Sequence, residues 1–274
     1  MKDKHVQILF ISMLVLFSNV VSAKMLHRET AISLYYNFHD SKTLKDNPHK
    51  NNSPAISLVH LEVHDWGDAF MMVDLDNPIP SLGRQNKYHP DFPEWTQLRI
   101  ASSVSYNLTG NDKGGVGWNF DVNYMLVTEA YAMDHNLIPA ISRDFKTENW
   151  FVRTGFGPLF ANFQMDSLEP GNLGNTDTHF GGSHFYITGN TVLDLAGYKM
   201  PFSIAATHRY TSDSRIEVMP LEERQLYGYT SEIKFPLGEH FDARIRHMWG
   251  KGDFGFSQVG GGGHYLMVGF DYRL

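Results

Sequence analysis

Apolar and polar positions alternate strictly along the last ten residues of the chain. One side of this stretch is a continuous apolar and aromatic row, made of Leu266, Val268, Phe270, Tyr272 and Leu274. The residues between them are mostly small or polar. Because successive side chains of a strand point to opposite faces, the pattern predicts a strand with one apolar and one polar face.

A second stretch, residues 116–126, repeats this alternation over a longer run. Large apolar side chains such as Trp118 and Phe120 alternate there with glycine, asparagine and aspartate. The run matches the length of a tilted strand that crosses a membrane, roughly 9–11 residues, whereas strands of soluble proteins most often have about five or six. Residues 98–108 precede it across the turn-forming segment 109–114, so the two runs predict a hairpin.

About twelve such strands account for the chain. They are expected at residues 32–38, 56–63, 69–75, 98–108, 116–126, 150–156 with a continuation to 163, 183–187, 191–195, 202–210, 227–235, 241–249 and 265–274. Residues 130–146 are interpreted as a short helix or a loop, and Gly189-Asn190 as a hairpin turn. Short turns alternate with longer polar loops, which is typical of an all-β, transmembrane, antiparallel up-and-down barrel. One such barrel is expected to span residues 24–274.

The first 23 residues have the parts of a secretory signal peptide. A basic start with Lys2 and Lys4 precedes the uncharged apolar run 6–21, and the small residues Ser22 and Ala23 follow. The apolar run has about 16 residues, fewer than the ~20 that a membrane-spanning helix needs. We therefore expect residues 1–23 to be a cleaved signal peptide.

Composition excludes several classes of protein. Thirty acidic residues outnumber 23 basic ones, for a net charge of −7, which argues against a nucleic-acid partner. The chain has no cysteine, so an exported fold must be held by a core or a closed sheet instead of disulfides. Aromatic residues make up 14% and charged residues 19%, as suits a barrel with interfacial aromatic girdles.

The terminal strand resembles the closing strand of bacterial outer-membrane β-barrels, which the barrel assembly machinery reads. Strands of that kind most often end in Phe, and this one ends in Leu274. The resemblance implies location in the outer membrane of a Gram-negative bacterium. It implies contact with outer-membrane lipid and lipopolysaccharide, and with the assembly machinery.

Charged residues concentrate in the rows opposite the apolar ones. Those expected to face the lumen are Arg99, Asp121, Arg153, Arg209, Glu232, Lys234, Asp242, Arg244, Arg246, Asp271 and Arg273. An Arg or Lys on a lipid-facing row costs ~2–4 kcal/mol at the bilayer midplane, so charges belong inside. Such an interior is either a polar pore for small solutes or a network of salt bridges that plugs a narrow barrel.

Residues 61–74 resemble the nucleoside-specific channel-forming (Tsx-like) outer-membrane proteins. The matching residues, in order, are Glu62, Trp66, Gly67, Asp68, Phe70 and Asp74. The resemblance implies a twelve-stranded monomeric barrel that takes up nucleosides. Trp66, Asp68, Phe70 and Asp74 are the expected substrate-binding residues, with Phe70 stacking on a base and Asp74 accepting a ribose hydroxyl.

Other constellations are weaker. The triplet His60-x-Glu62-x-His64 has metal-ligand chemistry, but fourteen histidines make chance clusters common, and neither a metal nor another cofactor is expected. Ser231 and His247 lie on neighbouring predicted strands, in rows assigned to lipid. The sequence thus favours a non-enzymatic channel for small polar solutes. The alternatives are a barrel enzyme acting on lipid or lipopolysaccharide, and a non-conducting structural or receptor barrel.

Overall fold

The computed structural model describes residues 24–47, 50–79, 82–91, 96–109, 116–129, 132–165, 178–218, 224–251 and 262–274. The expected signal peptide, residues 1–23, lies outside the described residues.

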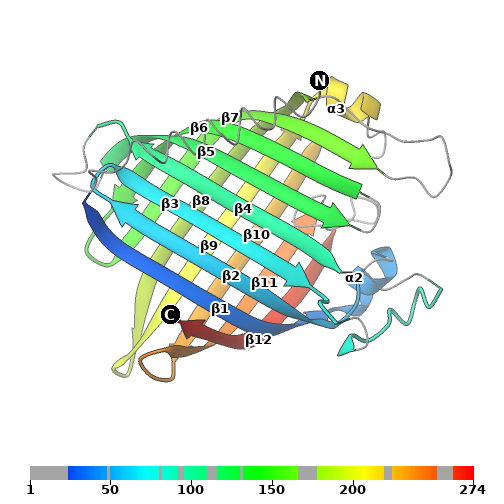
Figure 1. The fold of residues 1–274 in the computed structure, drawn as a ribbon, viewed down its shortest axis with the longest axis horizontal. Coiled ribbons are helices and arrows are strands. Elements are labelled where there is room, and N and C mark those ends of the chain that lie inside the picture. Colours follow the sequence, from blue (N-terminus) through cyan, green and yellow to red (C-terminus); the bar gives the residue numbers. More distant parts are fainter. Residues whose placement is uncertain are drawn as a thin grey trace.

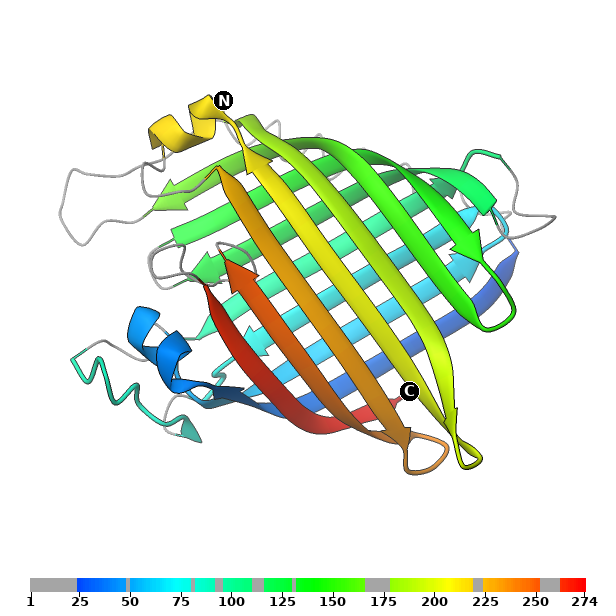
Figure 2. The ribbon, with the colours of Figure 1, turned by 180° about the vertical axis from the view of Figure 1, so that it is seen from behind.

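Twelve antiparallel strands form one closed barrel (Figures 1 and 2). They are β1 (Met25–His39), β2 (Ser53–His64), β3 (Gly67–Asp76), β4 (Gln97–Asn107), β5 (Val116–Glu129), β6 (Ala132–Lys146), β7 (Trp150–Met165), β8 (His179–Leu195), β9 (Tyr198–Thr211), β10 (Gln225–Pro236), β11 (Phe241–Lys251) and β12 (Gly263–Arg273). Each strand pairs with its neighbours in sequence, and β1 pairs with β12 to close the sheet. The expected all-β, up-and-down barrel of about twelve strands is confirmed.

The alternation of apolar and polar residues along the strands places the apolar side chains on the outside of the barrel and the polar ones inside. In β12, Phe270 is 58% exposed and its neighbour Asp271 is 1% exposed. The same contrast holds in β5, where Trp118 and Phe120 are exposed and Asn119 is buried. Because closing the sheet leaves no strand edge, the backbone needs no cover, and side chains alone decide what each surface contacts.

Two expectations for single elements are wrong. Residues 132–146, interpreted as a helix or loop, form the fifteen-residue strand β6. Its inward row includes the apolar Ile138 and Ala140, which pack on Leu159 and Ala161 of β7, so polar and apolar positions do not alternate as in the other strands.

The hairpin expected about Gly189-Asn190 is also absent, because residues 179–195 form the single strand β8. Gly189 is paired on both sides, with Val152 of β7 and Ile204 of β9. The turn comes later, at Ala196 and Gly197, whose φ angles of 54° and 86° reverse the chain.

The barrel has two unlike ends. At one end the described connections include tight turns such as 65–66 and 196–197, and the C-terminus lies at this end (Figures 1 and 2). At the other end, called here the helix end, lie α2 (Ser41–Asp46) and α3 (Asp213–Val218), in segments expected to be loops. Neither of these six-residue helices is long enough to cross a membrane, and no other described helix is either.

Candidate functional site

The barrel interior is lined by charged side chains. The structure places all the charged residues expected in the lumen on the inward rows. Those that are buried are Arg99, Asp121, Arg209, Glu232, Asp242, Arg244 and Asp271. Buried charges must be paired to be tolerated, so the partners of each decide what the interior does.

One group of partners surrounds the inward face of β3. Arg99 of β4 lies 3.3 Å from Asp74 and 2.9 Å from Asp76. The hydroxyl of Tyr35 on β1 donates to Asp74 at 3.2 Å, and Arg99 donates to the hydroxyl of Tyr265 on β12 at 3.2 Å. Asp74 is therefore engaged by an arginine and a tyrosine.

A second contact crosses the lumen nearer the turn end. Arg153 of β7 donates to Asp144 on the adjacent strand β6, with its Nε 2.6 Å from Oδ1. The same guanidinium reaches past β6, β5 and β4 to Asp68 of β3, with Nη2 2.8 Å from Oδ2. A single arginine thus joins two walls of the barrel.

Tyr186 of β8 forms a further crossing. Its hydroxyl donates to Asp121 of β5, which also accepts from Ser105 at 2.5 Å. The ring lies over Gly155 of β7, where a Cβ would come within 2.2 Å of it. Glycine at this position therefore gives the tyrosine room to lie across the lumen.

Another cluster of ion pairs lies on the inward faces of β10, β11 and β12. Glu232 accepts from Arg246 at 2.5 Å, and Arg244 lies 3.5 Å from the same carboxylate. Asp271 lies 2.9 Å from Lys234 and 3.3 Å from Arg244. The guanidinium of Arg244 also lies 5.1 Å from the ring centroid of Tyr35, which links this cluster to the partners of β3.

The two remaining arginines of the expected lumen set lie apart from these clusters. Arg209 is 3% exposed on β9, opposite His184 of β8 in the register. Arg273 lies at the turn end, where its Nε is 3.2 Å from Asp242. Near Arg209 at the helix end, Arg215 of α3 lies 3.1 Å from Asp134 of β6, so α3 is anchored to the barrel wall.

The expected substrate-binding residues are divided by the structure. Asp68, Phe70 and Asp74 share the inward row of β3, and the two carboxylates pair with arginines. Trp66 lies in the β2–β3 turn and stacks on His64 and Tyr106 at 5.3 and 6.3 Å. Both of those rings belong to outward rows, so Trp66 lies with the outer aromatic residues, away from Phe70.

The His60-Glu62-His64 triplet and the Ser231–His247 pair both lie on outward rows. His60 and His64 each contact Glu62, at 3.2 and 3.1 Å, and no metal-binding group of three or more side chains occurs within the described segments. Ser231 and His247 are directly opposite in the register, and the Nε2 of His247 lies 3.4 Å from the Nδ1 of His264.

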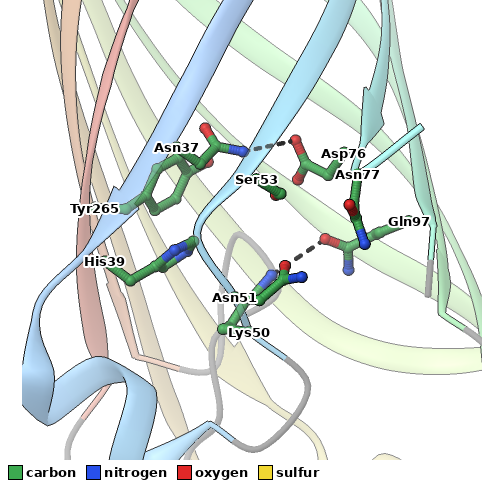
Figure 3. Close-up of a pocket in the computed structure, with 9 residues that line it drawn as sticks. All are labelled: Asn37, His39, Lys50, Asn51, Ser53, Asp76, Asn77, Gln97 and Tyr265. Carbon is green, nitrogen blue, oxygen red and sulfur yellow. Dashed lines mark hydrogen bonds between the residues drawn. The ribbon is translucent and has the colours of Figure 1, made fainter. Parts of the chain in front are cut away.

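A polar pocket opens among the strand ends at the helix end (Figure 3). Side chains from five strands and two loops line it: Asn37, His39, Lys50, Asn51, Ser53, Asp76, Asn77, Gln97 and Tyr265. None of these was a candidate in the sequence. The loop residues have no periodicity that could reveal them, whereas Asn37 and His39 stand in the polar row of their strand, which is a signal for an inward position.

The fold and its interior define a class of protein: a closed twelve-stranded antiparallel β-barrel with an apolar exterior and an ion-paired, polar interior. No protein-family model matches the chain, and no curated protein matches it.

Among solved structures, the chain is similar to several porins at low identity. A NanC porin shares 8% identity at a TM-score of 0.45, over 90% of this chain and 100% of that one. A KdgM porin in complex with disordered oligogalacturonate shares 7% identity at a TM-score of 0.43, over 89% and 99%. OprD from Pseudomonas aeruginosa shares 10% identity at a TM-score of 0.33, over 90% and 93%. With TM-scores below 0.5, these likenesses carry no conclusion about function.

Proposed function

We propose that the chain is an integral β-barrel of the bacterial outer membrane, exported by a signal peptide at residues 1–23. The outward rows of the barrel carry exposed apolar and aromatic side chains, and the inward rows carry the charges. Water would favour the opposite distribution, whereas a bilayer requires this one, because a lipid-facing Arg or Lys costs ~2–4 kcal/mol near the midplane. In this orientation, the start of β1, the C-terminus and the tight turns face the periplasm.

Within the membrane, the barrel acts as a narrow and selective channel for small polar solutes. The observation that carries this proposal is the inward concentration of charged and amide side chains. Arg99, Arg153 and Tyr186 cross the lumen, so the passage is restricted and large solutes are excluded. Ion pairs with several polar neighbours can exchange partners as a solute passes, which an apolar core cannot do.

Nucleosides are the solute class that we propose, from the Tsx-like residues of β3. Phe70 is half-buried on the inward face and offers a ring on which a base can stack. Asp68 and Asp74 do not bind the nucleoside directly in this proposal, because Arg153 and Arg99 already engage their carboxylates. Trp66, on the outer side, then anchors the barrel at the membrane interface.

The test is single-channel current in planar bilayers, with and without uridine. A channel of this kind gives a small current that uridine blocks, and Phe70→Ala needs several-fold more uridine for the same block, as expected from losing one stacking contact. Met72→Ala, which shortens a neighbouring inward side chain of β3, is the matched control. A current that uridine does not affect would exclude nucleosides, and the absence of current would exclude the channel.

A second candidate is a non-conducting barrel, which the depth of burial favours. Arg244, Asp271 and Asp121 are each 2% exposed or less. An interior filled to that degree suits a structural or receptor barrel whose loops bind a partner. The bilayer measurement distinguishes the two candidates, because a filled barrel carries no current with or without solute.

A third candidate function is a lipid-modifying enzyme, which the strand register of β10 and β11 allows us to test. Ser231 directly opposes His247 on the outward face, where lipid would reach both side chains. Hydrolysis of phospholipid or lipopolysaccharide by the purified protein, lost in Ser231→Ala, would establish this activity in place of the channel.

A further inference from the structure

We infer that a polar patch on the outside of β1 and β2 binds the zwitterionic headgroup of phosphatidylethanolamine. This patch, called here the seam patch, consists of Arg28, Thr30, His60, Glu62 and His64. The inference rests on the proposed membrane location and deepens it, because it names one class of lipid and the side chains that recognise it.

The outward rows of β1 and β2, which lie side by side in Figure 1, change from apolar to polar at the same register. Ile32 pairs with Leu58, and their side chains are 38% and 36% exposed. The next outward pairs toward the turn end belong to the seam patch: Thr30 with His60, and then Arg28 with Glu62. Two adjacent strands thus share one sharp boundary, as expected where acyl chains give way to headgroups.

Apolar residues border the seam patch on both sides. On the β12 side, Leu274 is exposed, and its N–H donates to the Thr30 carbonyl at 2.9 Å. On the β3 side, Glu62 pairs with Ala69, which pairs in turn with Val104 of β4. The polar groups therefore occupy a confined area within the apolar outer surface.

Aromatic side chains place the seam patch at the depth of the lipid headgroups. Trp66 stacks on His64 of the patch, with ring centroids 5.3 Å apart, and on Tyr106 at 6.3 Å. Trp and Tyr collect at the interface between membrane and water. A charged side chain on the lipid face destabilises a barrel strongly at the bilayer midplane but only slightly near the interface, so Arg28 and Glu62 are tolerated at this depth.

Hydrogen bonds leave the seam patch with one charge of each sign. The Nε2 atoms of His60 and His64 lie 3.2 and 3.1 Å from the two carboxylate oxygens of Glu62. An ionised carboxylate only accepts, so each Nε2 carries a hydrogen, and Nδ1 of His60 accepts from the Thr30 hydroxyl at 2.7 Å. Nδ1 of His64 is buried without a partner among the described residues, so a second hydrogen there would be unsatisfied. The remaining charges are those of Arg28 and Glu62.

Both charged groups have further capacity for hydrogen bonds. The Arg28 side chain is 59% exposed, and its Nε lies 3.9 Å from Glu62, too far for a hydrogen bond. Its guanidinium has five N–H donors, which suit phosphate oxygens. The Glu62 side chain is 31% exposed, and a carboxylate has about four acceptor positions, of which the two histidines use only a part.

A phosphoethanolamine headgroup is complementary to this arrangement. Two methylene carbons separate its phosphate from its primary ammonium, so its opposite charges lie next to each other, as those of Arg28 and Glu62 do. The phosphate accepts from the guanidinium, and the ammonium donates to the carboxylate. The acyl chains then extend along the exposed Ile32 and Leu58. Phosphatidylcholine has methyl groups in place of the N–H donors, and phosphatidylglycerol has no cation.

The test is native mass spectrometry of the full barrel in detergent, incubated with equal amounts of phosphatidylethanolamine, phosphatidylcholine and phosphatidylglycerol that have the same acyl chains. The wild type should retain phosphatidylethanolamine about two- to fivefold more than either other lipid, as for an exposed charge pair. Glu62→Gln keeps an acceptor but removes the charge, and should lose the preference over phosphatidylglycerol. Arg28→Gln should retain less of all three lipids, because each has the phosphate.

Arg143→Gln is the matched control, since Arg143 is an exposed, outward arginine near the turn end of β6, outside the seam patch, and it should keep the wild-type preference. Equal retention of the three lipids by the wild type, or an unchanged preference in Glu62→Gln, would overturn the inference. A wild-type dimer that Glu62→Gln converts to a monomer would also overturn it, because the patch would then contact a second copy of the chain.

Cell fractionation separates this inference from the proposed function. A barrel that is found in the outer membrane but shows no lipid preference loses only the headgroup site. A protein that is recovered outside the membrane fraction loses the membrane location, and the headgroup site with it.

Discussion

The guanidinium of Arg153 donates to both carboxylate oxygens of Asp68, at 2.8 and 3.1 Å, although their strands β7 and β3 are four positions apart in the barrel. Arg153→Met should leave Asp68 and Asp144 without this cation. Removing one partner of a buried pair costs about 3–5 kcal/mol, and this pair is part-buried, so the cost should be smaller, but the folded barrel should still convert to its unfolded gel band at a lower temperature.

The matched control for that change is Arg143→Met. Arg143 is exposed on the outward row of β6, with its guanidinium 5.2 Å from the ring centroid of Trp118. Its loss should shift the gel transition little. Equal shifts in the two variants would show that the crossing contact adds nothing to stability.

The proposed membrane location predicts an effect of depth along one strand. Ile245 and Phe241 share the outward row of β11, with Ile245 in the middle and Phe241 at the turn end. Ile245→Arg should impair assembly strongly, at a cost of ~2–4 kcal/mol, and Phe241→Arg only slightly, at ~0–1 kcal/mol. The yield of heat-modifiable protein in outer-membrane fractions measures both. Equal yields would mean that this face does not contact lipid.

Gly155 predicts a packing effect. In Gly155→Ala the new methyl group meets the ring of Tyr186, which must move away from Asp121. Overpacking of this size costs about 1–3 kcal/mol, so the gel transition temperature should fall. Gly189→Ala is the control, because a Cβ there would come no closer than 3.3 Å to its neighbours. A stable Gly155→Ala barrel would contradict the crossing of Tyr186.

Acidification should loosen the loop at the pocket. Burial acts to raise the pKa of Asp40, but the hydrogen bonds from Thr43 and the nearby His264 and Lys42 outweigh it, and the pKa is lowered. Asp40 caps α2 by accepting from the Thr43 N–H at 2.6 Å. A lowered pKa means that the carboxylate stabilises α2 fully above its ordinary pKa, and that this contribution is lost as the pH falls through the lowered pKa.

Hydrogen exchange of residues 40–47 at several pH values measures this loss. Exchange should accelerate in acid in the wild type, whereas Asp40→Asn, which caps without titrating, should show no such acceleration beyond the intrinsic pH effect. Asp40→Ala should exchange faster at every pH, since losing a cap costs about 1 kcal/mol. A wild type that behaves like Asp40→Asn would show that Asp40 does not control the loop.

The alternation of residues predicted the barrel because most strands have one apolar and one polar face. It failed at β6, where Ile138 and Ala140 point inward and pack on β7. It failed again in β8, where Gly189-Asn190 has turn chemistry but both neighbouring strands hold it extended. Local propensity does not include contacts with residues that are distant in sequence, and those contacts decide the structure at both places.

The site was predictable only in part for the same reason. Strand period places Phe70 and Asp74 on one face, and the structure has them there, with Asp68 in the same row because β3 begins earlier, at Gly67. Period cannot show that Arg99 and Arg153 engage the two carboxylates, because those contacts depend on which strands face each other across the closed barrel. The pocket residues Lys50, Asn51 and Asn77 come from loops, where no period exists.

The pairing of β1 with β12 joins the first and last strands of the chain, so the cylinder closes only when both are present. The contacts of Arg99 with Tyr265 and of Arg244 with Tyr35 extend across or beside this junction, and neither can form in an open sheet. A chain stalled before closure therefore exposes these arginines to solvent, together with two free strand edges. Quality-control proteases would encounter an intermediate with exposed interior charges and unpaired strand edges. The closed barrel exposes neither of them.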